Sequence, residues 1–383
     1  MAAIGLSRFA LGMILPAMGG GLGLSYSEMG FVSTGNLVGY LLAVAASGRL
    51  YAHFGARKLI TTGLCACAAS MAVVSRATGF SQVLVAYVVT GFGSGLANVP
   101  IMALVSMWFR RSHRGRAAGL IVSGIGMGVV LTGWFIPRVN ALLGADGWRY
   151  NWLLLSLAAL AVALIGAFFI RNRPADVGLT PLGEDPVAAQ NAGTLGARRQ
   201  PGKYVMILGL IYFFYGFSYV IYVTFLVTTL VKEMGLSEAA AGRFWMWVGI
   251  FSVFSGPIFG SVSDRVGRKT GLAIVYSFQV AAYLLIAAPH RLDLVGLSVF
   301  LFGITAWAIP SIMAASVGDY VGPEKAAAAF GAITLIFGVG QIAGPAIAGM
   351  LADLSGGFSA AYLLAAGMAA AAVVSTRLLP RTS

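Results

Sequence analysis

Long apolar runs separated by short polar stretches recur along the whole chain. The runs fall near residues 1–20, 26–50, 57–77, 80–109, 115–137, 148–170, 204–231, 238–262, 269–288, 293–317, 325–350 and 358–377. Each reaches the roughly 20 residues that a helix needs to cross the ~30 Å hydrocarbon core of a bilayer. The pattern therefore predicts an all-α membrane protein with twelve transmembrane helices and no separate soluble domain.

The apolar runs divide into two sets of six around the polar stretch 171–203. This stretch holds several prolines and charges of both signs, a composition typical of a linker. We therefore expect an N-terminal six-helix bundle over 1–170, a cytoplasmic linker over 171–203 and a C-terminal six-helix bundle over 204–383.

The two halves repeat one another at a constant shift in residue number, the shift that takes Leu22 to Met234. Leu22-Gly23-Leu24-Ser25 matches Met234-Gly235-Leu236-Ser237, and Gly55 matches Gly267 at the same shift. A parallel repeat predicts two bundles related by a pseudo-twofold axis along the membrane normal, with a substrate site near mid-depth. Because the seventh helix begins near Tyr204, the shift also predicts a first helix that is short at its cytoplasmic end, and hence a coding start upstream of Met1.

Composition and charge agree with a membrane protein. Hydrophobic residues make up 59% of the chain and charged residues only 10%, while 51 glycines allow helices to approach closely in lipid. The formal net charge is +13, but most of the Lys and Arg fall in the predicted loops on one side. This asymmetry predicts a multi-pass protein of the bacterial inner membrane with both termini in the cytoplasm, and it requires no nucleic-acid partner.

One polar motif stands between the eighth and ninth apolar runs. Gly260-Ser-Val-Ser-Asp264-Arg265-Val-Gly267-Arg268-Lys269 resembles the signature of the major facilitator superfamily, and its first-half copy runs from Gly48 to Lys58 with Ala52 in place of the aspartate. The resemblance implies the major facilitator fold and a cytoplasmic gate in which this aspartate binds a helix N-terminus and nearby Arg residues. The gating residues it implies are Gly48, Arg57, Gly260, Asp264, Arg265, Gly267, Arg268 and Lys269.

Two other segments indicate a narrower group. Gly5-Leu-Ser-Arg8-Phe-Ala-Leu-Gly12 and Tyr215-Gly-Phe-Ser-Tyr219 are similar to the YbfB/YjiJ-type branch of the superfamily. The linker start, Arg173-Pro-Ala-Asp-Val-Gly-Leu, resembles the oxalate/formate and monocarboxylate groups.

Arg8 is the most informative single residue. If the first helix ends near Gly20, Arg8 lies about 18 Å deeper at 1.5 Å per residue, close to mid-bilayer. A charge at that depth costs at least ~2.5–3.5 kcal/mol, and every acidic residue falls in a predicted loop or near a helix end. Two interpretations stay open: Arg8 binds a substrate anion, or it extends to the cytoplasmic interface.

The seventh predicted helix carries Tyr212, Tyr215, Tyr219 and Tyr222, whose spacing places them on one face. We expect their hydroxyls to donate to a substrate carboxylate, and packing against lipid or a neighbouring helix is the alternative. The other candidate residues for the pocket are Tyr87, Asn98 and Trp307. Asn36 and Gln341 are either ligands or helix–helix contacts.

These features predict a secondary active transporter that moves a small organic anion, such as a carboxylate, by alternating access. A proton or a counter-anion would accompany the substrate. The alternatives are an exporter of an uncharged or amphiphilic compound and a non-transporting sensor or scaffold on the same fold. The sequence shows no catalytic constellation, so we expect no enzyme activity, cofactor or metal site. The expected partners are a small-molecule substrate and the lipid bilayer, with the protein a monomer.

Overall fold

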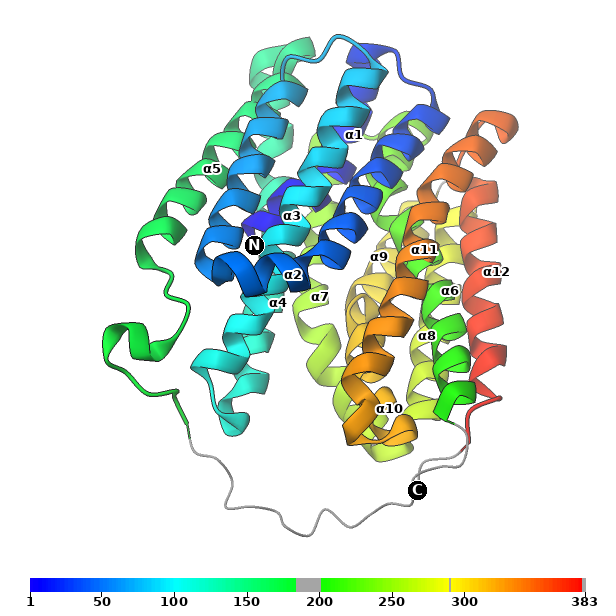
Figure 1. Ribbon diagram of the computed structural model, residues 1–383. Helices are drawn as coiled ribbons and strands as arrows, with labels where there is room; N and C mark the ends of the chain where they lie inside the picture. The colour runs from blue at the N-terminus through cyan, green and yellow to red at the C-terminus, as the bar shows by residue number, and fades with distance from the viewer. Residues whose placement is uncertain (184–200, 289–290, 381–383) are drawn as a thin grey trace. The chain divides into compact units, whose positions relative to one another are not determined.

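The computed structural model describes residues 1–183, 201–288 and 291–380 (Figure 1). Within this part of the chain, regular structure is almost entirely helical. The chain forms two compact units, one of Met1–Leu24 with Gly35–Ala192 and the other of Ser25–Thr34 with Gly193–Ser383.

The first half of the chain begins with a π-helical segment, η1 (Ala2–Phe9), that continues directly as α1 (Ala10–Leu22). It is followed by α2 (Tyr26–Val74), α3 (Phe80–Trp108), α4 (Arg111–Leu143) and α5 (Gly147–Phe169). Two short 3-10 turns, η2 (Gly144–Asp146) and η3 (Pro174–Val177), precede and follow α5.

The second half contains α6 (Pro201–Thr228), which ends in a second π-helical segment, η4 (Thr229–Glu233). The remaining helices are α7 (Glu238–Val266), α8 (Arg268–Ala287), α9 (Leu292–Thr305), α10 (Ala308–Val321), α11 (Pro323–Ser355) and α12 (Ser359–Thr376). Within the second unit, α6 packs against both α11 and α12 (Figure 1).

Ten helical spans of the described residues are long and apolar enough to cross a membrane. Two of them, Tyr26–Val74 with 49 residues and Arg116–Phe169 with 54, are about twice the length that one crossing needs. Each is interrupted by a glycine with positive φ, Gly55 in the first and Gly144 in the second. Each can therefore hold two crossings, so the ten spans agree with the twelve helices predicted from the sequence.

The repeat predicted from the sequence is visible in the backbone. Positive φ values occur in pairs at the shift seen in the sequence: Gly23 (64°) with Gly235 (67°), Gly55 (75°) with Gly267 (85°), and Gly144 (61°) with Gly356 (77°). A residue with a side chain adopts this left-handed region only with strain, so glycine is required where each helix stops or turns. Turns at corresponding positions thus recur in each half of the chain.

The two compact units do not coincide with the two halves of the chain. Ser25–Thr34, the start of α2, packs with the second unit. Of the predicted linker 171–203, residues 184–200 lie outside the described part of the chain. The described start of the linker folds back, since the Leu182 amide donates to the Trp108 carbonyl (2.9 Å) and the Arg110 amide donates to the Leu182 carbonyl (2.9 Å).

Candidate substrate and gating sites

Arg8 lies near the end of the π-helical segment η1. In this segment the Leu6 amide donates to the Met1 carbonyl five residues earlier (3.2 Å), and the Ser7 hydroxyl donates to the Ala2 carbonyl (2.8 Å). Gly5 has no side chain and packs against the backbone of Gly128 on α4. π-helical segments within α-helices are rare and occur frequently at functional sites.

The Arg8 guanidinium packs against aromatic rings. Its central carbon lies 5.4 Å from the centroid of the Tyr40 ring and 5.6 Å from that of Phe9. Asn98 on α3 donates its side-chain N–H to the Tyr40 hydroxyl (3.0 Å). Arg8, Tyr40 and Asn98 therefore bring together η1, α2 and α3, and all three are partly exposed. A guanidinium can interact with an aromatic ring and also bind an anion through its N–H donors.

Tyr87 binds the backbone that carries Arg8. It is 1% exposed, and its hydroxyl lies within donating distance of the carbonyls of Ser7 (2.9 Å) and Arg8 (3.0 Å). The Asn36 side-chain amide in turn donates to the Tyr87 carbonyl (3.2 Å). The structure thus directs the Tyr87 hydroxyl towards the π-helical peptide groups, so Tyr87 positions Arg8 within the first unit.

The four tyrosines of α6 do share one face. Tyr212, Tyr215 and Tyr219 stack in series, with ring centroids 6.0 Å and then 4.6 Å apart, and all four tyrosines are buried. The Tyr222 hydroxyl lies 2.9 Å from that of Ser298, and Gln341 donates its amide to the Tyr219 hydroxyl. These hydroxyls therefore have partners inside the second unit.

Tyr215 of α6 contacts the turn that interrupts the helix between α9 and α10. In an uninterrupted helix the Ala306 carbonyl would accept from the backbone nitrogen of residue 310, but Pro310 has no N–H. The Tyr215 hydroxyl donates to the Ala306 carbonyl instead, and the Trp307 amide donates to the Ser255 hydroxyl (2.9 Å). The structure thus shows an interruption between α9 and α10 that the side chains of Tyr215 and Ser255 stabilise.

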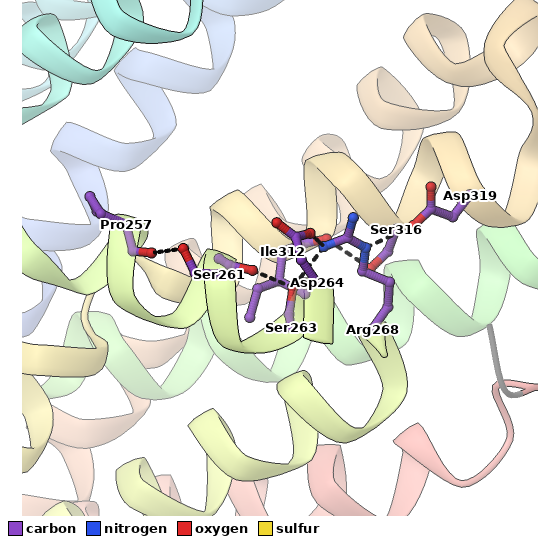
Figure 2. Close-up of polar contacts among 9 residues, drawn as sticks. Pro257, Ser261, Ser263, Asp264, Arg268, Ile312, Ser316 and Asp319 are labelled. Atoms are coloured by element: carbon purple, nitrogen blue, oxygen red, sulfur yellow. Dashed lines mark hydrogen bonds and ion pairs between the residues drawn. The ribbon is translucent and has the colours of Figure 1, made fainter. Parts of the chain in front are cut away.

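The polar motif of the second half lies where α7 passes into α8 (Figure 2). Arg268 forms ion pairs with Asp264, four residues earlier, and with Asp319 on α10 (Nε to Oδ2, 2.7 Å), and it also donates to the Ser263 hydroxyl (2.7 Å). Lys269 donates to the carbonyls of Arg377 (2.9 Å) and Leu379 (3.0 Å). The turn itself is made by Gly267, whose φ of 85° favours glycine.

The first-half copy of this motif has different contacts. Ala52 and Ala56 occupy the positions that correspond to Asp264 and Arg268, so the ion pair has no counterpart there. Arg57 instead binds the end of α5, with its amide donating to the Asn172 side chain (2.9 Å) and its Nε to the Ala167 carbonyl (2.7 Å). Gly48 and Gly260 lie on helix surfaces, and neither packs closely against another backbone.

The chain matches, over residues 1–377, the model of a protein family described as "Uncharacterised MFS-type transporter YbfB". It belongs to that family. The protein is therefore a membrane transporter of the major facilitator superfamily, and not an enzyme.

Two relatives and one solved structure extend this identification. The chain is 25% identical to the hexuronate transporter of Bacillus subtilis (strain 168), over 95% of this chain and 88% of the relative. It is 27% identical to monocarboxylate transporter 13 of Bos taurus, over 82% of this chain and 72% of the relative. The crystal structure of the nucleoside transporter NupG has the same fold, with a TM-score of 0.71 and 16% identity over 98% of each chain.

The sequence singled out Arg8 and the motif of this MFS transporter as candidates, and it gave no indication of Tyr40. Tyr40 carries no charge and follows a run of apolar residues, so only its contacts with Arg8 and Asn98 identify it. Each acidic residue that the structure describes lies at or next to a helix end or in a loop, as the sequence predicted. In the described part of the chain, no group of three His, Cys, Asp or Glu could hold a metal ion.

Proposed function

We propose that this transporter carries a small organic anion and that Arg8 binds the anionic group. The observation that supports the proposal most directly is the packing of the Arg8 guanidinium against Tyr40, with Tyr87 fixing the Arg8 backbone. Cytoplasmic snorkelling, the alternative interpretation, does not require a side chain held on two aromatic rings. The names of the two relatives refer to carboxylate-bearing substrates, hexuronates and monocarboxylates, which agrees with an anion.

The first-unit cluster offers the right chemistry for a carboxylate. The guanidinium presents planar paired donors, which match the two oxygens of a carboxylate. The Tyr40 hydroxyl accepts from Asn98 and can still donate its own hydrogen to a ligand. Within the second unit, Tyr219 and Trp307 are the candidate substrate contacts, and Tyr212, Tyr215 and Tyr222 support them by packing.

The remaining features of the transport cycle belong to the same proposal. The protein moves its substrate by alternating access across the bacterial inner membrane, as a monomer with both termini in the cytoplasm. The described acidic residues lie at helix ends or in loops. The substrate therefore carries its own proton or exchanges for a second anion.

Substitution of Arg8 tests the anion site. Arg8→Lys keeps the charge but loses the paired donors, so we expect affinity for a carboxylate to fall about tenfold or more, while Arg8→Gln should abolish binding. The measurement is the ligand-induced rise in unfolding temperature of the purified protein against a panel of hexuronates and mono- and dicarboxylates. Arg76→Gln, at an exposed loop arginine, is the matched control. Full ligand stabilisation of Arg8→Gln would refute the anion site.

A further inference from the structure

The start of α2 is held by a carboxylate that lies 327 residues away in the sequence. Near the end of α11, Asp353 accepts hydrogen bonds from the amides of Tyr26 (Oδ1, 2.9 Å) and Ser27 (Oδ2, 2.9 Å). These amides belong to the first turn of α2, where backbone N–H groups have no partner within the helix. A carboxylate in this place also interacts favourably with the positive end of the helix dipole.

Contacts continue along α2 beyond this cap. The Ser33 and Thr224 hydroxyls lie 3.1 Å apart, and the Thr34 hydroxyl donates to the Ile342 carbonyl (2.8 Å). Gly30 packs directly against the carbonyl of Pro345 on α11, where a side chain could not fit. Ser25–Thr34 therefore docks on α6 and α11 as part of the second unit, and α2 continues into the first unit from Gly35.

The N-terminus of α2 also has a local cap that does not involve Asp353. Ser25 and Glu28 already form a reciprocal capping pair there, with the Ser25 amide donating to Glu28 (2.9 Å) and the Glu28 amide to the Ser25 hydroxyl (3.2 Å). In the repeated half, the start of α7 has its own cap, since Ser237 accepts from the Ala240 amide (3.2 Å). At the shift that relates the two halves, Ala141 takes the place of Asp353.

We propose that Asp353 is a gating residue of this transporter. Its carboxylate holds the first turns of α2 against α11. This contact lies at the end of the second unit opposite the Asp264–Arg268 motif, since α11 begins beside that motif and ends near Asp353. When the transporter opens at this end of the second unit, the two hydrogen bonds to Asp353 must break and Ser25–Thr34 must separate from α6 and α11. The proposal concerns the conformational cycle and does not depend on the identity of the substrate.

Disulfide formation between two substituted residues measures docking directly. Ser33→Cys and Thr224→Cys replace hydroxyls that lie 3.1 Å apart, in a background with Cys65→Ala and Cys67→Ala. With a mild oxidant, the cross-linking rate reports the docked population. Asp353→Asn removes the charge and one acceptor, and losing one charge-assisted hydrogen bond should lower the docked-to-undocked ratio about tenfold.

Asp293→Asn is the matched control for charge. Asp293 lies at the start of α9, at the same end of the second unit, and pairs with Arg291 two residues away (2.7 Å). We expect slower cross-linking in Asp353→Asn and a wild-type rate in Asp293→Asn. Equal rates in Asp353→Asn and wild type, or an equal decrease in both variants, would overturn the proposal.

A backbone substitution tests the same bond without changing Asp353. Tyr26 is the first residue of α2, a position that tolerates proline. Tyr26→Pro therefore removes the N–H that donates to Asp353 without breaking the helix. Tyr26→Ala keeps that N–H, and both variants lose the ring that packs against Phe358 (4.8 Å). Slower cross-linking in Tyr26→Pro than in Tyr26→Ala supports the proposal even if Asp353→Asn fails to fold. Equal rates in the two Tyr26 variants would contradict it.

Discussion

The hydrogen bond from Tyr215 to the Ala306 carbonyl should be energetically coupled to Pro310. The carbonyl lacks a helical partner because proline has no N–H, and the tyrosine hydroxyl takes that place. Tyr215→Phe therefore leaves a buried carbonyl without a donor. In a Pro310→Ala background the new N–H can reach the same carbonyl, so loss of the hydroxyl should matter much less.

The expected size follows from the location of the bond. A buried polar group that loses its partner costs about 1–3 kcal/mol, and side-chain hydrogen bonds inside membrane proteins average ~0.6 kcal/mol with a maximum near 1.7. Tyr215 is 0% exposed and its carbonyl acceptor has no helical donor, so we expect a cost towards the upper end, about 1.5 kcal/mol. The coupling energy between the two substitutions should be about 1 kcal/mol.

A double-mutant cycle measured by equilibrium unfolding of the purified protein in micelles tests this coupling. Tyr276→Phe serves as the control, because Tyr276 is also buried and donates to a backbone carbonyl, that of Ile211 (2.7 Å). The Ile211 carbonyl also has a helical donor, the backbone N–H of Tyr215 four residues later. Tyr276→Phe should therefore cost the same stability with Pro310 as with Pro310→Ala. Equal costs of Tyr215→Phe with and without Pro310 would refute the reasoning.

Two further predictions concern the Arg8 cluster and the motif. Tyr40→Phe keeps the ring beside Arg8 and should lower affinity for the carboxylate a few-fold. Tyr40→Leu also loses ~0.5–2 kcal/mol of cation–π energy and should lower this affinity at least tenfold. Both affinities are measured from the unfolding temperature as ligand is titrated. Identical affinities in the two variants would contradict a role for the ring. Arg268→Gln should slow uptake at least tenfold and change unfolding temperature little, since its two acidic partners are 64% and 43% exposed. An uptake rate equal to wild type, at matched protein amount, would exclude a gating role for Arg268.

The helices and the repeat could be predicted because their causes are local. An apolar run of membrane-spanning length has few alternatives to a helix in lipid, and glycines at a fixed shift indicate turns that any residue with a side chain would strain. The paired positive φ values at Gly55 and Gly267 confirm this reasoning in detail.

The missed features depend on how helices meet. Tyr40 contacts Asn98 across 58 residues, and Asp353 contacts Tyr26 across 327, so neither pairing leaves a periodic signal in the sequence. The π-helical form of η1 was not predicted either, and the contact of its Gly5 with Gly128 on α4 is likewise a tertiary feature. Charge, length and repeat therefore identify the class of protein, whereas the partners of each polar group come from packing.

The mismatches of the repeat indicate where the two halves have separate roles. Some glycines that match between the halves make turns, such as Gly55 and Gly267, and others make close helix contacts, such as Gly128 and Gly340. Several charged residues have no charged counterpart: Val220 corresponds to Arg8, Ala141 to Asp353, and Ala52 and Ala56 to Asp264 and Arg268, whereas Arg57 and Lys269 are both basic. A charge inside the membrane is costly, so a charge such as Arg8 with no counterpart in the other half indicates a role specific to its own half. This agrees with the two proposals, in which Arg8 supplies the charge for the substrate, while Asp353 and the Asp264–Arg268 pair act at opposite ends of the second unit.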